Sequence, residues 1–248
     1  MFFLWGGATD NDPTPADVAG VVSWYNPNVL GSLFQDSGGT TPVTSDGDPV
    51  GLMQDLSGEG NHLIQATSGN RPVYRTDGWT RWLEFNGTSH TMATASAVAM
   101  TPDCYIAGVF EFVGAAAGGA AVETLFGFGE AGDTNRQAII SRRPAALVAQ
   151  FSNRFAATPA DPQIVIALAS DTPTLFEGFY ESGVASLIIG EGTPATETRA
   201  VTGTASEEIN LIKPETPTNF HGGVIIGQAA SADDKELIRD TLKAAAGL

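Results

Sequence analysis

Short apolar runs separated by glycine-rich and proline-rich turns are the main feature of this 248-residue sequence. In the clearest run, residues 105–113, Ile106 and Phe110 fall on one face and Tyr105 and Val109 on the other. Such alternation predicts a β-strand that is half-buried or central in its sheet. Because no helical periodicity separates the runs, the pattern favours an antiparallel sandwich over a parallel sheet with crossover helices. Further strands are expected at residues 124–129, 136–141, 147–152, 163–168, 174–180, 185–190 and 222–227.

The composition supports one globular domain. Hydrophobic residues make up 42% of the chain and charged residues 16%, while the 29 glycines and 14 prolines follow no repeat. All-β sandwiches of this length are commonly single domains. We therefore expect one domain over residues 18–248, in which the polar, proline-punctuated residues 193–219 form a long surface loop.

The charge balance limits the partners of the protein. Lysine and arginine number 12 against 28 acidic residues, which gives a formal net charge of −16. Nucleic acids and anionic membranes require a basic face, so neither is expected as a partner. No apolar run reaches the length of a membrane span, and the start lacks the basic segment of a secretion signal. Synthesis and folding in a cytoplasm are therefore expected.

The single cysteine constrains redox chemistry. Cys104 cannot form an internal disulfide, and it excludes a cysteine-rich zinc site. It opens the apolar run described above, so we expect a buried thiol without a reactive role.

The C-terminus carries the only clear helical pattern. Ile238 and Leu242 are spaced by one helical turn, Ser231 is placed to cap the first turn, and Gly247 suits the position after the last. One amphipathic helix over residues 232–246, packed on the edge of the sandwich, is predicted.

The first 17 residues are expected to form an arm. Phe2, Phe3, Leu4 and Trp5 precede a Gly-Gly pair and the sequence Asp-Asn-Asp-Pro-Thr-Pro, which cannot continue a helix or a central strand. An exposed cluster of four such side chains needs a cover. Two interpretations are open: the cluster packs on its own domain, or these four residues bind a partner subunit.

A series of turn motifs between residues 24 and 87 points to a known superfamily. The motifs are Trp24-Tyr-Asn-Pro, Leu33-Phe-Gln-Asp, Thr41-Pro-Val, Asp46-Gly, Pro49-Val-Gly, Asp55-Leu-Ser-Gly-Glu-Gly-Asn-His, Arg71-Pro and Leu83-Glu-Phe-Asn-Gly. Together with the later strands and the closing helix they resemble the concanavalin-A-like lectin/laminin-G superfamily, and more narrowly a group found in tailed bacteriophages and prophages. The resemblance covers roughly residues 18–248. It implies an all-β, two-sheet antiparallel jelly-roll sandwich with one C-terminal helix.

The resemblance does not extend to catalysis. Glycosidases of this superfamily carry a Glu-x-Asp-x-x-Glu strand, and no Glu-x-Asp occurs in this chain. The superfamily also contains lectins and purely structural modules, so the fold alone does not assign a function. We therefore expect a protein that is not an enzyme.

Asp55 and Asn61 are the candidate metal ligands. With Ser57 and His62 they lie in a compact loop whose oxygen atoms could bind calcium. The alternative is turn chemistry, in which Asp and Asn side chains bond to their own backbone. The spacing matches no strong calcium loop, which favours the alternative. No other cofactor is expected.

Trp79 and Tyr74 are the candidate carbohydrate-binding residues, because aromatic rings offer a flat face to sugars. Asp77-Gly78 and Thr80-Arg81 bracket Trp79, which makes it the better candidate for an exposed ring. Packing in the core is the alternative for both residues.

Two further sets of titratable residues could carry chemistry. Glu177 and Glu181 fall on one face of a predicted strand, where a carboxylate pair could serve glycoside hydrolysis, but a solvated strand face is the favoured interpretation. The histidines His62, His90 and His221 flank different strands, and surface or packing roles are expected.

These features together predict a non-enzymatic bacteriophage virion protein, either a head decoration or a tail or fibre component. The arm would attach it to other virion proteins, a homo-oligomer is expected, and the sandwich could contact host surface polysaccharide. The alternative is a carbohydrate-binding adhesin or receptor-binding module. A polysaccharide depolymerase ranks last.

Overall fold

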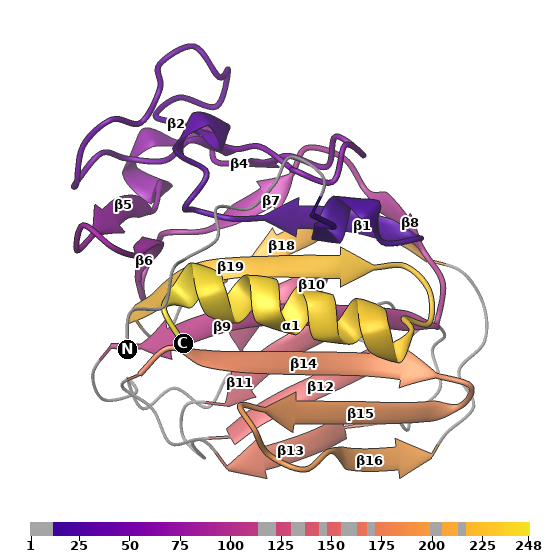
Figure 1. Cartoon of the computed structure of the whole chain (residues 1–248). Coiled ribbons are helices and arrows are strands. Elements are labelled where there is room, and N and C mark those ends of the chain that lie inside the picture. The colour runs from indigo at the N-terminus through magenta and orange to yellow at the C-terminus, as the bar shows by residue number, and fades with distance from the viewer. Residues whose placement is uncertain are drawn as a thin grey trace.

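The computed structural model describes residues 12–113, 123–129, 137–143, 148–154, 163–167, 172–198, 205–212 and 217–248. Within these residues two large sheets, A and B, lie face to face, and one helix lies along the outer face of sheet A (Figure 1). Every named strand pair is antiparallel. The predicted two-sheet antiparallel sandwich with a C-terminal helix is confirmed.

Sheet A has eight strands and sheet B has nine among the described residues. Sheet A runs in the order β16 (Ala195–Thr198), β15 (Val184–Ile189), β14 (Thr174–Glu181), β9 (Cys104–Phe112), β19 (Pro217–Ile226), β6 (Arg81–Asn86) and β5 (Val73–Thr76), and β1 (Val21–Tyr25) pairs with β19. Sheet B runs in the order β13 (Gln163–Ala167), β12 (Val148–Arg154), β11 (Gln137–Arg143), β10 (Glu123–Phe128), β18 (Ile209–Leu211), β7 (Met92–Thr94), β4 (Leu63–Ile64), β3 (Leu52–Met53) and β2 (Leu33–Phe34).

Several short elements complete the described chain. The strands β17 (Ala205–Glu207) and β8 (Val98–Met100) form a separate ribbon. Three short 3-10 helices are η1 (Pro15–Asp17), η2 (Leu30–Ser32) and η3 (Ser68–Asn70).

Strand β9 shows how sequence alternation builds two cores. Ile106 and Phe110 point between the two sheets and join the main hydrophobic core. Tyr105 and Val109 point the other way and join a second core beneath the helix. This split confirms the predicted alternation, and it explains why β9 is apolar on both faces. Cys104 is fully buried in the main core, and this burial raises the pKa of its thiol to about 12.

Helix α1 (Ala232–Ala246) has the predicted limits. Its first turn is closed by Ser231, whose hydroxyl accepts the Asp234 amide at 3.1 Å while the Asp234 carboxylate accepts the Ser231 amide. Gly247 ends the helix in the left-handed conformation with φ +73°. Ile238 and Leu242 pack onto the outer face of sheet A, over strands β9 and β19, so burial of this apolar face holds the helix on the sandwich. The predicted position at the edge of the sandwich was wrong, because the outer side of these inner strands is itself apolar and needs a cover.

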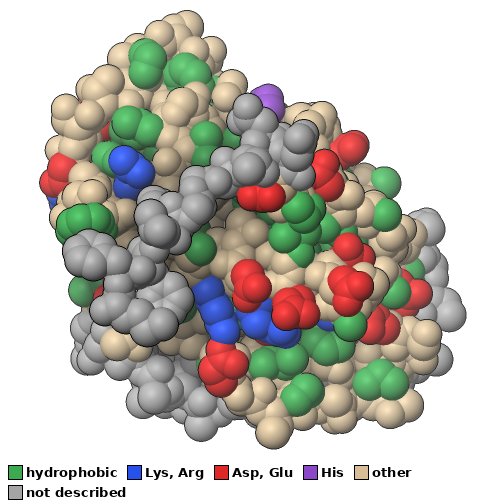
Figure 2. Space-filling model, viewed as in Figure 1, with side chains coloured by type: hydrophobic (Ala, Val, Ile, Leu, Met, Phe, Trp, Pro, Cys, Tyr) green, Lys and Arg blue, Asp and Glu red, His purple; other side chains and the backbone are tan. Residues whose placement is uncertain are grey.

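The prediction for Glu177 was wrong. Its side chain is 1% exposed beneath α1, where the Arg239 guanidinium and the Tyr105 hydroxyl bond to it. Glu181 pairs with Lys235 of the same helix at 2.6 Å. Both carboxylates therefore anchor the helix, and neither forms part of a solvated strand face. Figure 2 shows the basic side chains along α1 surrounded by acidic ones.

The prediction of a long surface loop over residues 193–219 was also wrong. Strands β16, β17, β18 and the first residues of β19 fall in this range, and Ile209, Leu211 and Thr218 are buried. Strands β16, β17 and β18 are each only three or four residues long. Such short strands leave little alternation to read in the sequence, and their pairing depends on distant segments.

The predicted arm, residues 1–17, is described only from Asp12 onward. Pro15 is buried in η1, and Val18 is 5% exposed in the core under α1. Phe2, Phe3, Leu4 and Trp5 lie outside the described residues. Their assignment as partner-binding residues therefore stays a prediction.

Candidate functional site

The loop from Asp55 to His62 is organised by one buried carboxylate. Asp55 is 7% exposed, and its Oδ1 accepts the amides of Trp24 and Ser57, both at 2.9 Å. Its Oδ2 accepts the Ser57 hydroxyl at 2.8 Å and the Asn61 amide at 3.0 Å. Four donors thus saturate this side chain and tie the loop to strand β1.

The end of the loop is fixed by two more side chains. The Asn61 amide group donates to the carbonyl of Val22 at 2.8 Å, and the hydroxyl of the buried Tyr25 donates to the Asn61 carbonyl. The ring of His62 accepts the Asp55 amide at Nδ1, at 3.0 Å. A nitrogen that accepts a hydrogen bond carries no proton, so the ring proton of neutral His62 is on Nε2.

This geometry accounts for Asp55 and Asn61 without a metal ion. Both Asp55 oxygens are engaged by protein donors, and the Asn61 side chain bonds to backbone. In the described part of the chain, no group of three or more His, Cys, Asp or Glu side chains is placed to hold a metal. The arrangement is that of an Asx-stabilised loop, the alternative that the sequence left open.

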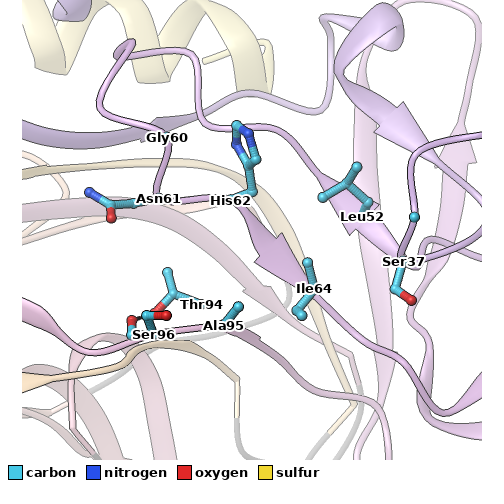
Figure 3. A pocket seen from close by; sticks show the side chains of 10 residues that line it. Ser37, Leu52, Gly60, Asn61, His62, Ile64, Thr94, Ala95 and Ser96 are labelled. Atoms are coloured by element: carbon cyan, nitrogen blue, oxygen red, sulfur yellow. Dashed lines mark hydrogen bonds between the residues drawn. The ribbon is translucent and has the colours of Figure 1, made fainter.

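One wall of a surface pocket is formed by this loop. The pocket has a volume of about 410 Å³, and Figure 3 shows that Gly60, Asn61 and His62 lie on one side of it, with residues 94–96 opposite. Ligand sites in proteins commonly occupy about 300–1,000 Å³, so this space suits a small molecule. Its full lining is Ser37, Gly38, Leu52, Gly60, Asn61, His62, Ile64, Thr94, Ala95 and Ser96.

The lining combines polar side chains with apolar ones. Leu52 and Ile64 supply an apolar floor from the paired strands β3 and β4. None of the ten lining residues is Asp, Glu, Lys or Arg. A ligand that suits this surface carries hydroxyl groups and some apolar area, and it needs no charge.

The walls are stiffened by hydrogen bonds. The Thr94 hydroxyl donates to the Ser96 carbonyl at 2.9 Å and accepts the Ile209 amide at 3.0 Å. On another side, the Asp36 carboxylate accepts the Gly38 amide at 3.1 Å and the Thr41 amide at 2.6 Å. Backbone hydrogen bonds lower the pKa of Asp36 to about 2, and the bond from the Thr41 amide has the largest effect. A wall held in this way keeps its shape before a ligand arrives.

The two aromatic candidates are placed very differently. Trp79 is 90% exposed in the turn between β5 and β6, as its flanking residues predict. Asp77 holds this turn by accepting the amides of Trp79 at 2.8 Å and Thr80 at 2.7 Å, and these bonds lower the pKa of Asp77. Tyr74 is 3% exposed in the main core, so it offers no ring face to a ligand and leaves the candidate set.

Most of the pocket could not be found from the sequence. Asn61 belongs to a recognisable turn motif, but Ser37, Thr94 and Ser96 come from segments far apart in the chain that carry no motif. Trp79 does not line the pocket. The sequence signal was therefore confined to the loop around Asp55, where turn chemistry is local.

No protein-family model and no curated protein matches the sequence. Solved structures do match. A mutant GH54 α-L-arabinofuranosidase soaked with 4-nitrophenyl α-L-arabinofuranoside has a TM-score of 0.61 at 13% identity, over 94% of this chain and 66% of its own. Another structure of a GH54 α-L-arabinofuranosidase, soaked with a cyclic sulfate inhibitor, has a TM-score of 0.53 at 12% identity, over 80% of this chain and 51% of its own.

Trypanosoma rangeli sialidase in complex with sialic acid has a TM-score of 0.55 at 12% identity, over 92% of this chain and 34% of its own. The chain thus spans about a third of the length of the sialidase chains that it matches. At such identities the likeness shows a shared fold.

No helix in the described part of the chain combines the length and the apolar character needed to cross a bilayer.

Proposed function

We propose that this protein is a carbohydrate-binding β-sandwich of the concanavalin-A/laminin-G-like jelly-roll kind, which binds a neutral saccharide in the pocket beside the Asp55–His62 loop. The observation that carries the proposal is the pocket itself, about 410 Å³ in volume and lined by hydroxyl, amide and imidazole groups over Leu52 and Ile64. Sugar hydroxyls both donate and accept hydrogen bonds, while their C–H groups pack on apolar side chains.

The charge of the site favours a neutral sugar. No lining residue is a lysine or arginine that could pair with a carboxylate, phosphate or sulfate. The protein as a whole carries a formal charge of −16, which repels anionic ligands at a distance. A sialic acid or a uronic acid should therefore bind more weakly than a neutral sugar of the same size.

The same lining favours binding over hydrolysis. Glycoside hydrolysis usually needs two carboxyl groups that flank the scissile bond. None of the ten lining residues has a carboxyl group, and the sequence contains no Glu-x-Asp strand motif. The matching structures of a sialidase and an arabinofuranosidase support a sugar as the ligand to test first, since their fold is shared with this chain.

A pocket-filling variant tests the proposal. Ala95 lines the pocket and is exposed, so Ala95→Trp should obstruct ligand entry without disturbing the core. Ala99 is exposed on β8 outside the lining, and Ala99→Trp is the matched control. A glycan array should first identify a neutral ligand, followed by isothermal titration. We expect A95W to weaken binding at least tenfold and A99W to bind normally. No binding by the unmodified protein, or equal binding by both variants, would contradict the pocket assignment.

We also propose the biological setting, a bacteriophage virion in which the protein decorates the head or belongs to the tail or fibre. The motif series between residues 24 and 87 supports this setting, as does the apolar start Phe2, Phe3, Leu4 and Trp5, which would attach the protein to a neighbouring subunit. Burial of several hundred Å² at about 25 cal/mol per Å² gives several kcal/mol before ordering costs.

Purified particles test the setting directly. Mass spectrometry of virions should detect the polypeptide. A variant in which residues 2–5 are all replaced by serine should be absent from the particles, and its circular dichroism spectrum should show an unchanged fold. Normal incorporation of that variant would contradict attachment through the arm. Glycan binding by the isolated domain is a separate readout, so the two proposals can fail independently.

A further inference from the structure

His62 is the one titratable side chain in the lining of the pocket, and its two ring nitrogens have different surroundings. Nδ1 accepts the Asp55 backbone amide at 3.0 Å, a bond that closes the loop from Asp55 to His62. Nε2 has no hydrogen-bond partner among the described residues, and the ring is only partly buried. Nδ1 therefore stabilises the loop, and Nε2 is available to a ligand.

The hydrogen bond to Nδ1 fixes the tautomer of the ring. A backbone N–H can only donate, so Nδ1 must present its lone pair to Asp55, and the proton of the neutral ring is then on Nε2. At this point of its surface the pocket offers a hydrogen-bond donor. This differs from the hydroxyls of Ser37 and Ser96 in the lining, since a serine hydroxyl can rotate to donate or to accept.

We propose that His62 selects the saccharide, with Nε2–H donating to an acceptor oxygen of the sugar while Nδ1 holds the loop that carries it. This inference rests on the proposed function and adds its specificity. The ligand class is a neutral saccharide that places an oxygen acceptor, such as a ring oxygen, a hydroxyl or an acetamido carbonyl, against this ring. An analogue with a hydrogen or fluorine in place of that oxygen loses the bond.

Asp55 is a positioning residue for this contact. Its carboxylate gathers the amides of Trp24, Ser57 and Asn61, and its own amide meets the ring of His62. The ring orientation thus depends on a network that also anchors the loop to β1, so the donor is placed before the ligand binds. Pre-placed donors lose less entropy on binding than free side chains do.

Two substitutions separate the roles of the two nitrogens. In His62→Asn the side-chain oxygen can take the place of Nδ1, so the loop keeps its acceptor, but nothing replaces Nε2. In His62→Gln the amide group reaches the place of Nε2, and the acceptor for Asp55 is lost. We expect H62N to keep the exchange protection of the Asp55 amide and to weaken saccharide binding by about 2–10-fold. H62Q should lose that protection.

A spectroscopic measurement reports the tautomer independently. Long-range ¹⁵N–¹H correlation of the unmodified protein should show Nδ1 of His62 unprotonated and Nε2 protonated, and added saccharide should shift the Nε2 signal. Wild-type affinity in H62N, or a ring protonated at Nδ1, would overturn the inference.

Failure of the proposed function would look different. In that case no saccharide would bind the unmodified protein, while the tautomer and the protection of the Asp55 amide would still be as described. The ligand half of the inference would then be overturned, and the loop-holding role of Nδ1 would stand.

Discussion

The guanidinium of Arg239 on α1 donates two hydrogen bonds, of 2.9 and 3.2 Å, to the carboxylate of Glu177 on β14. Glu177 is 1% exposed, and the Tyr105 hydroxyl donates to its Oε1 at 2.7 Å. This carboxylate raises the pKa of Arg239, whereas the pKa of Tyr105 is raised mainly by burial and further by the same carboxylate. The relationship joins the C-terminal helix to the centre of sheet A, 62 residues away along the chain.

Removal of the guanidinium should strongly destabilise the fold. Arg239→Ala leaves the buried Glu177 carboxylate without its countercharge, a change that costs about 3–5 kcal/mol. Lys243→Ala is the control, because its partner Glu191 is 80% exposed. Exposed pairs contribute about 0–1 kcal/mol. Urea unfolding of both variants measures the difference, and equal losses would show that burial of Glu177 does not decide the effect.

The protein should lose stability in mild acid through His221. Burial is the main cause that lowers the pKa of this ring from its ordinary value of 6.5, and Glu111, with Oε2 at 3.7 Å, only partly opposes it. The unfolded chain therefore binds a proton at a higher pH than the folded chain. Stability from this group is fully present above pH 6.5 and falls as the pH drops through the lowered folded value.

His221→Gln removes this titration. The slope of unfolding free energy against pH below 6.5 should be shallower in H221Q than in the unmodified protein. The slopes are compared rather than the absolute stabilities, since the substitution also changes packing. Identical slopes would show that His221 is not the group responsible.

Gly178 on β14 should not tolerate a side chain. A Cβ at this position would lie 2.3 Å from Cδ2 of Phe151, whose ring reaches across the core from β12. Gly178→Ala should therefore lower the unfolding free energy by about 1–3 kcal/mol through overpacking. A Cβ added at Gly69 would meet no atom within 4 Å, so Gly69→Ala is the matched control. Thermal unfolding distinguishes the two, and an unaffected G178A would mean that the sheets separate to admit the methyl group.

Trp79 should be dispensable for folding. Its side chain is 90% exposed, so Trp79→Ala should change stability by less than about 0.5 kcal/mol. Trp82 packs beside His221 with ring centres 5.8 Å apart, and Trp82→Ala should destabilise the protein clearly. Titration of W79A with the saccharide that binds the pocket then asks whether this ring contributes to recognition. Unchanged affinity would restrict the sugar contact to the pocket.

Local signals explain what could be predicted from the sequence. The limits of α1 depend on Ser231, Gly247 and the spacing of Ile238 and Leu242, all of which act within a few residues. The alternation in β9 is similarly local, and Trp79 was the better candidate for an exposed ring because turn residues flank it. The burial of Tyr74 could not be seen, because it depends on how β5 lies against the main core.

Long-range pairing explains the rest. The strands within residues 193–219 are short, and β18 is a strand only because β10 and β7 lie on either side of it. Glu177 was predicted to be solvated because the sequence does not show that α1 covers it and brings Arg239 within hydrogen-bond distance. The polar residues Ser37, Thr94 and Ser96 line one pocket only because the sheet brings β2, β3, β4 and β7 together.

Local residue patterns are enough to specify the strand character of the chain, the capped helix at its end and the Asx loop around Asp55, because backbone hydrogen bonding and side-chain alternation act over a few residues. The packing of the two sheets and the helix, in contrast, fixes which polar groups share a pocket and which carboxylate is buried against an arginine. Those outcomes depend on contacts between segments far apart in the chain, which no local pattern records.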